Sequence, residues 1–247
     1  MALDFPNAPT ANQQFPSPVM TGIGTWLWDG SAWTVPPLIP KVITVNATGS
    51  KLWQGTAVTS QTYTGITIAA GTHIALVVTL GWDAPATTPT AMTMTWDSGG
   101  SNQAMTRIIT SDTGSHAGSN SELWGLVNPA VGNKTLALSW TSASRVFISS
   151  MAFNGVDQTG GVTSFPNSVF SASATTVSVA SASGHKVMCC GVSNSYPGAI
   201  TGTTIFYDGT SGTVVYAYAN YDNGAASVPI GSASGNGPVV ATDIRAG

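Results

Sequence analysis

Short segments in which apolar and polar residues alternate cover most of the chain after its first fifty residues. In residues 91–96, Met92, Met94 and Trp96 fall on one face of an extended chain, and Thr93 and Thr95 fall on the other. Successive side chains of a β-strand point to opposite faces, so this pattern predicts a half-buried antiparallel strand. The same alternation occurs at Leu136, Leu138 and Trp140, and at Tyr216 and Tyr218.

Clusters of Gly, Asn, Asp and Pro separate these segments and mark turns. The predicted strands span residues 54–68, 72–82, 91–97, 103–110, 120–128, 133–141, 145–154, 175–180, 185–194, 203–207, 213–221 and 237–244. No helical pattern intervenes, and no repeat of fixed period is present. The prediction is an all-β protein in which residues 51–247 form a single jelly-roll-like, two-sheet antiparallel sandwich.

Residues 1–50 form a different kind of segment, because they hold seven of the 14 prolines. Proline lacks a backbone donor, so the segment is predicted to be an extended arm with one small hairpin over residues 26–33, turning at Asp29-Gly30. A segment this short and rich in proline cannot bury large rings by itself. Its aromatic side chains must pack on the sandwich or on another chain, and these are Phe5, Trp26, Trp28 and Trp33.

The composition narrows the class of protein. Charged residues make up 7% of the chain and hydrophobic residues 43%, which argues against disorder. The seven Lys and Arg are scattered, so the chain lacks the cationic cluster that nucleic-acid binding requires. Its polar character comes instead from 33 Thr and 28 Ser, which are neutral hydrogen-bonding groups.

The chain has no apolar run long enough to span a membrane, and its first residues lack the pattern of a signal peptide. We therefore expect no membrane insertion. Cys189 and Cys190 are adjacent, so their side chains should point to opposite faces of a strand without forming a disulfide. This fits folding in a reducing cytoplasm.

The inventory of reactive residues predicts no enzyme, cofactor or metal site. Glu122 is the single Glu, although nine Asp could contribute to a carboxyl pair for glycoside hydrolysis. The histidines lack zinc-ligand spacing, and no Gly-x-Ser-x-Gly elbow is present. Asp97 with Asn102, and Asp208 with Asp222, could donate oxygens to calcium, but turn formation is the commoner role of such residues.

Aromatic residues near predicted loops are candidates for stacking on sugar rings, since a flat apolar face beside neutral hydroxyls suits a carbohydrate. Their alternating positions favour core packing as the competing interpretation. The candidate glycan-contacting residues are Trp82, Trp96, Tyr196 and Tyr207.

Two blocks near the N-terminus carry a resemblance to a known group of proteins. The sequence DFPNAPT at residues 4–10, followed by WLWDGSAW at residues 26–33, resembles a short module of bacteriophage virion structural proteins, including tail-fibre proteins. The resemblance covers about 33 residues and implies that the arm attaches the protein to a particle or to a sister subunit. The residues implied in that attachment are Asp4, Phe5, Pro6, Trp26, Trp28 and Trp33.

Residues 121–129 and 153–159 are similar to segments of lectin-like β-sandwich domains in phage and bacterial surface proteins. Together the resemblances imply a non-enzymatic virion protein, assembled in the bacterial cytoplasm and displayed on the particle surface. It would be a homotrimeric head decoration or head-fibre protein with glycan adhesion, partnered by capsid or tail proteins.

Three alternatives stay open. The first is a tail-fibre or receptor-binding protein that recognises host surface polysaccharide. The second, less favoured, is a virion-associated polysaccharide depolymerase. The third is a bacterial lectin, which would need an export route that the N-terminus does not show.

Overall fold

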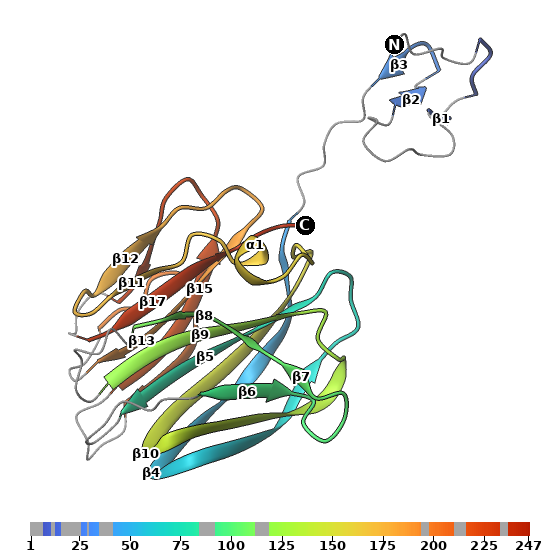
Figure 1. Ribbon diagram of the computed structural model, residues 1–247. Helices are drawn as coiled ribbons and strands as arrows, with labels where there is room; N and C mark the ends of the chain where they lie inside the picture. The colour runs from blue at the N-terminus through green and yellow to red at the C-terminus, as the bar shows by residue number, and fades with distance from the viewer. Residues whose placement is uncertain are drawn as a thin grey trace. The chain divides into compact units, whose positions relative to one another are not determined.

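The computed structural model describes residues 7–10, 13–15, 26–28, 30–34, 42–83, 92–111, 119–193, 198–209, 216–232 and 237–247 (Figure 1). The chain divides into two compact units, Met1–Pro40 and Lys41–Gly247. The first long strand of the second unit begins at Thr44. The boundary therefore follows Pro40, whereas the sequence placed it after residue 50.

The first unit contains a small antiparallel sheet in the order β1-β2-β3. Strand β2 pairs with both neighbours, and its hairpin with β3 places Trp28 opposite Trp33. This agrees with the hairpin predicted over residues 26–33. The strands are β1 (Gln14–Phe15), β2 (Trp26–Trp28) and β3 (Trp33–Thr34).

A seven-stranded antiparallel sheet begins the second unit, in the order β7-β6-β10-β5-β9-β8, with β4 on the other side of β10. The long strand β10 pairs with β4 along its length, with β6 near its start and with β5 near its end. The strands are β4 (Thr44–Ile68), β5 (Ala75–Asp83), β6 (Thr93–Trp96), β7 (Gln103–Ala104), β8 (Thr106–Thr110), β9 (Ser119–Val127) and β10 (Gly132–Asn154).

The described residues of this unit also form a five-stranded antiparallel sheet in the order β11-β17-β13-β15-β14 and a two-stranded sheet of β12 and β16. One short helix, α1 (Gly161–Ser164), precedes them. The strands are β11 (Val169–Ser171), β12 (Thr176–Val179), β13 (Lys186–Ser193), β14 (Thr203–Gly209), β15 (Tyr216–Asn223), β16 (Val228–Gly231) and β17 (Val239–Ile244).

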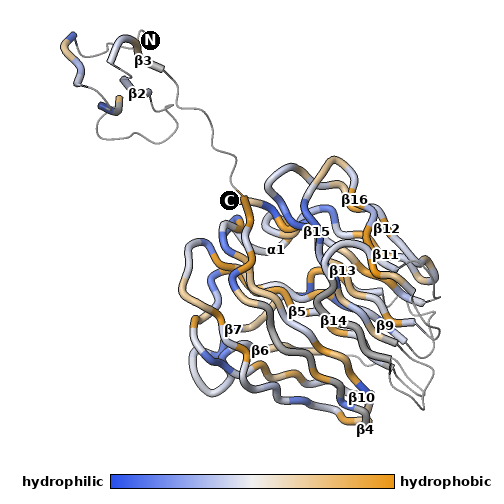
Figure 2. The backbone as a smooth tube through the Cα atoms, turned by 180° about the vertical axis from the view of Figure 1, so that it is seen from behind, coloured by the Kyte–Doolittle hydropathy of each residue, from blue (hydrophilic) through white to orange (hydrophobic). Residues whose placement is uncertain are grey.

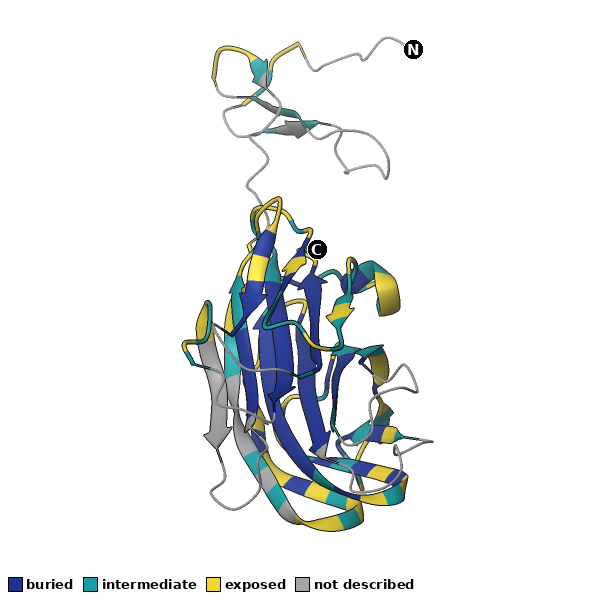
Figure 3. Cartoon of the chain, turned by 90° about the vertical axis from the view of Figure 1, so that its left-hand side faces the viewer, coloured by how far each residue is buried: buried dark blue, intermediate teal, exposed yellow. Residues whose placement is uncertain are grey.

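The seven-stranded sheet curls into a nearly closed, barrel-like form around its own hydrophobic cluster. Side chains from β4, β5, β6, β9 and β10 all contribute to this one cluster, which a flat sheet could not achieve. Along β10, buried and more exposed residues alternate before both faces become buried (Figure 3). The largest buried members of the cluster are Trp82, Trp96, Trp124 and Trp140.

The opposite face of β5 packs against the five-stranded sheet. Leu76 and Val78 face the inside of the curled sheet, whereas Ala75 and Val77 pack with Met188 and other residues of the second sheet. The first four residues of β5, at positions 75–78, are accordingly all hydrophobic (Figure 2). Strand β5 is thus buried on both faces, like a strand between two layers.

Strand β13 is buried on both faces in the same way. Cys190 packs between the two large sheets, and Cys189 points to a separate cluster that includes Val177 of β12 and Val228 of β16. The two-stranded sheet therefore covers the outer face of the five-stranded sheet. The described residues of the second unit form a two-sheet antiparallel sandwich with this small third layer.

The strand predictions were correct for the sandwich in outline, with specific differences. The predicted strands 133–141 and 145–154 are one strand, β10, which continues through a shift of register with β4 between Ser139 and Ser144. The predicted strand 103–110 is divided into β7 and β8. The sequence did not predict β11, β16 or α1, which are three or four residues long.

Candidate functional site

The aromatic residues of the first unit form a small cluster on its three-stranded sheet. The ring centroids of Trp28 and Trp33 lie 5.6 Å apart, and those of Phe15 and Trp33 lie 6.0 Å apart at 62°. The turn before β1 is held by Gln13, whose backbone N–H donates to the carbonyl of Thr10 at 2.9 Å. The sheet thereby brings together three rings that are separated in the sequence.

This cluster is incompletely buried. Phe15, Trp26, Trp28 and Trp33 are all of intermediate exposure. Units of about 40 residues usually need disulfides, metals or association with another molecule for stability, and Met1–Pro40 contains no cysteine. The predicted attachment residues Asp4, Phe5 and Pro6 lie outside the described residues.

Two of the four candidate glycan-contacting residues are buried. Trp82 is 1% exposed and Trp96 is 0% exposed, so neither ring offers a face to a sugar. The indole N–H of Trp96 donates to the Ala130 carbonyl at 2.9 Å. The glycan assignment of these two residues was wrong because the seven-stranded sheet curls around them. Tyr196 lies outside the described residues, and Tyr207 belongs to β14 with its side chain undescribed.

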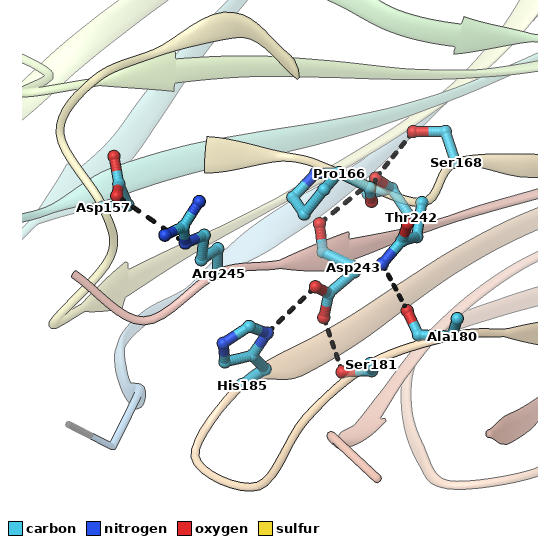
Figure 4. Close-up of polar contacts among 10 residues, drawn as sticks. Asp157, Pro166, Ser168, Ala180, Ser181, His185, Thr242, Asp243 and Arg245 are labelled. Atoms are coloured by element: carbon cyan, nitrogen blue, oxygen red, sulfur yellow. Dashed lines mark hydrogen bonds and ion pairs between the residues drawn. The ribbon is translucent and has the colours of Figure 1, made fainter. Parts of the chain in front are cut away.

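A buried aspartate on β17 organises a polar cluster that superficially resembles a catalytic triad (Figure 4). Asp243 is 1% exposed, and its two carboxylate oxygens accept from the Ser181 hydroxyl at 2.5 Å and bond the His185 Nδ1 at 2.9 Å. In a nucleophilic triad the hydroxyl must bond the imidazole. Here both groups bond the carboxylate, so the cluster ties the chain segment before β13 to β17.

Glu122 is a second buried carboxyl group, and it lies on β9. Its oxygens accept from the Trp124 indole at 2.7 Å and from the Arg107 guanidinium at 3.1 Å. Burial raises the pKa of the Glu122 carboxyl, while the Trp124 hydrogen bond and the charge of Arg107 act in the opposite direction. The carboxyl is held by these partners within the sheet and is not presented to a cleft.

The loop after β6 was the first calcium alternative. One Asp97 oxygen accepts from the backbone N–H and hydroxyl of Ser101, and the other lies 3.2 Å from Lys134 Nζ. These hydrogen bonds from Ser101, together with Lys134, lower the pKa of Asp97. The Asn102 amide oxygen accepts from the Gly99 N–H at 3.0 Å. Because Lys134 pairs with the Asp97 carboxylate and the Asn102 amide oxygen is already hydrogen-bonded, these residues stabilise a turn.

Asp208 and Asp222, the second pair of possible calcium ligands, do not form a described metal site either. Asp222 accepts from the adjacent Asn223 N–H at 2.7 Å, and the side chain of Asp208 is undescribed. Within the described ranges, no group of three His, Cys, Asp or Glu residues could hold a metal ion.

Cys189 and Cys190 are free and buried, and they face different clusters as the sequence predicted. Burial raises the pKa of the Cys190 thiol to about 12 and that of Cys189 well above its ordinary value. A thiol that stays protonated is a poor nucleophile, so the pair fills the core.

The outer face of the seven-stranded sheet carries a group of hydroxyls that the sequence analysis did not single out. Thr93 pairs with Ser139, which pairs with Ser60, and Thr95 pairs with Ala137, which pairs with Thr62. Residues opposite one another share a face of the sheet. We call this two-row surface across β6, β10 and β4 the hydroxyl face, and it consists of Ser60, Thr62, Thr93, Thr95, Ala137 and Ser139.

The part of the chain that the structure describes contains no helix with the length and apolar character of a membrane span. Comparison of the chain with protein-family models, with curated proteins and with solved structures gave no match.

Proposed function

We propose that this protein is a non-enzymatic bacteriophage virion structural protein, attached through its N-terminal unit and displayed on the particle surface as a head decoration or head-fibre protein. The observation that carries the proposal is the N-terminal unit itself. It bears the WLWDGSAW block that resembles phage virion proteins, and this block contributes Trp28 and Trp33 to a partly exposed aromatic cluster of the separate unit Met1–Pro40.

The exposed parts of these rings support a role in attachment. Trp and Tyr supply much of the energy of protein interfaces because each buries a large area at small entropic cost. A unit of this size without cysteines gains stability when its aromatic surface is covered. Capsid or tail proteins, or a sister subunit, are the partners that the resemblance implies.

The second unit is proposed to be the displayed part, a jelly-roll-like and lectin-like sandwich that assembles as a homotrimer. Its support is the two-sheet antiparallel architecture together with a surface rich in neutral hydroxyls. Since charged residues make up 7% of the chain, subunit contacts should depend on apolar burial and backbone hydrogen bonds. Dissociation of the oligomer by modest NaCl concentrations would contradict this part of the proposal.

Gold-antibody labelling of intact source-phage particles, viewed by electron microscopy, tests the proposal. Label over the head is the expected result, and absence of label from particles would refute a virion role. A Trp28→Ala/Trp33→Ala variant should reduce the label by about tenfold or more, since two aromatic anchors are lost. Phe170→Ala is the matched control because Phe170 is an exposed aromatic residue, 47% exposed, on the second unit.

The alternative placement is a tail-fibre or receptor-binding protein, which the same resemblance includes. The hydroxyl face favours a surface that meets polysaccharide, and label confined to the tail end would support this placement.

A polysaccharide depolymerase is the enzymatic alternative, and it requires two convergent carboxyl groups. Glu122 and Asp243 are instead engaged with Arg107, Trp124, Ser181 and His185. Release of reducing ends from host polysaccharide, lost in an Asp→Asn variant that remains folded, would establish the enzyme and refute our proposal.

A further inference from the structure

The hydroxyl face is hollowed where β6 meets β10. An open hollow of about 320 Å³ is lined by Thr93, Thr95, Ser98, Asn102, Ala137, Leu138 and Ser139. Ala137 lies between Thr95 and Thr62 in its row, so a small side chain stands between two larger ones. The hollow therefore presents hydroxyl and amide groups around the small apolar side chain of Ala137, because the Leu138 side chain is buried inside the curled sheet.

The lining of the hollow contains no charged side chain. Nearby, Asp97 and Lys134 form an ion pair with each other at 3.2 Å, so each offsets the charge of the other. A charged ligand would lose hydration without gaining an opposite charge. The charge distribution thus selects a neutral ligand.

The hydrogen-bonding groups further define that ligand. A hydroxyl both donates and accepts, and the Thr93 and Ser139 hydroxyls, 2.8 Å apart, form one mutual bond that leaves one donor and free lone pairs outward. The matching partner is a molecule with many neutral hydroxyls and an apolar C–H face to cover Ala137. Carbohydrates have this combination.

The arrangement of the two rows suits an extended chain of sugars. Thr93, Ser139 and Ser60 lie on three adjacent strands, so their backbone positions follow one another at about the strand spacing of 4.8 Å. The second row, from Thr95 through Ala137 to Thr62, runs parallel to the first. A linear polymer crossing the strands would meet repeated polar contacts.

We propose that the hydroxyl face binds a neutral polysaccharide, whose chain crosses β6, β10 and β4 over the hollow. This inference rests on the proposed surface display, to which it adds a ligand class and a site. It assigns glycan contact to threonines and serines of the sheet, in place of the buried Trp82 and Trp96.

Affinity electrophoresis of the purified full-length protein tests the inference. Gels contain dextran, mannan or galactan as neutral polymers, and polygalacturonate as the anionic comparison. At least one neutral polymer should retard the protein, and the dissociation constant should hardly change with NaCl because no charges are involved.

The decisive variant is Thr93→Val/Thr95→Val, which removes two hydroxyls while keeping β-branched side chains in the strand. Its binding should be about tenfold weaker or more. The matched control is Thr56→Val/Thr67→Val, since both residues are exposed on β4 but belong to neither row. Equal thermal unfolding of the two variants shows that a loss of binding is local.

Three results would overturn the inference: no retardation by any neutral polymer, retardation by polygalacturonate alone, or unchanged binding by Thr93→Val/Thr95→Val. These measurements use the isolated protein, whereas labelling of particles tests the virion role. A labelled particle whose protein binds no neutral polymer would refute the polysaccharide site and leave the proposed function standing.

Discussion

Removing the Asp243 carboxylate should destabilise the second unit strongly. The side chain is 1% exposed and bonds the Ser181 hydroxyl and the His185 imidazole. Hydrogen bonds to a charged group contribute about 1.5–3 kcal/mol each, and Asp243→Ala removes two of them. We therefore expect the substitution to lower the free energy of unfolding by about 3–5 kcal/mol.

Thermal unfolding followed by circular dichroism measures this effect. For a unit of this size, Tm falls by about 2–4 °C per kcal/mol, so the expected decrease is about 6–20 °C. Asp222→Ala is the control, because Asp222 lies on β15 of the same sheet, on the other side of β13, and accepts from the adjacent Asn223 N–H. A decrease for Asp243→Ala no larger than that for Asp222→Ala would show that the Asp243 cluster does not tie these segments together.

Three further changes test the core and its buried carboxyl group. Because burial raises the pKa of Glu122, the carboxyl group keeps its proton to a higher pH in the folded chain than in the unfolded chain. The stability of the wild type relative to Glu122→Gln should therefore be greatest in acid and should fall as pH rises through the raised pKa. Urea titrations from about pH 4 to pH 8 measure this difference. Trp96→Phe should cost about 1–3 kcal/mol by chemical denaturation, because the Ala130 carbonyl loses its donor, and it should leave polysaccharide binding unchanged. Gly191→Ala should cost about 1–3 kcal/mol in the same assay, since the new Cβ would lie 2.2 Å from the Tyr218 ring; wild-type stability would contradict the close packing of these strands.

Local alternation was sufficient to identify much of the core. Met94, Trp96, Leu136, Leu138 and Trp140 were predicted to share the inner faces of their strands, and all are buried. Inward and outward positions alternate by the geometry of a single strand, so neighbouring residues carry this information. Prediction of these faces therefore needed no knowledge of the partner strands.

The extent of enclosure depends on residues distant in the sequence. Strand β15 was predicted to be half-buried, yet Ala217, Tyr218 and Ala219 are all buried. One face of its sheet packs on the seven-stranded sheet, and β12 and β16 cover the other. Both cover strands are four residues long, and β16 contains a proline, so their own sequences gave little sign of this role.

The hydroxyl face also depends on both local sequence and the pairing of distant strands. The sequence placed Thr93 and Thr95 on one face of a strand, but their alignment with Ser139, Ser60 and Thr62 requires the register of three strands. Register follows from packing and turn geometry across the whole sheet, which no single segment specifies. The hydroxyl face was thus beyond sequence reasoning.

The pairing of β4 with β10 has a consequence for how the protein reaches its native state during synthesis. β4 spans 25 residues and carries one charged side chain, Lys51, and its partner strand begins at Gly132. A ribosome releases β4 well before β10 exists, so the nascent chain bears a long unpaired strand with little charge to discourage association. Chaperone binding to β4, during the time between the synthesis of β4 and that of β10, should therefore govern the yield of folded protein.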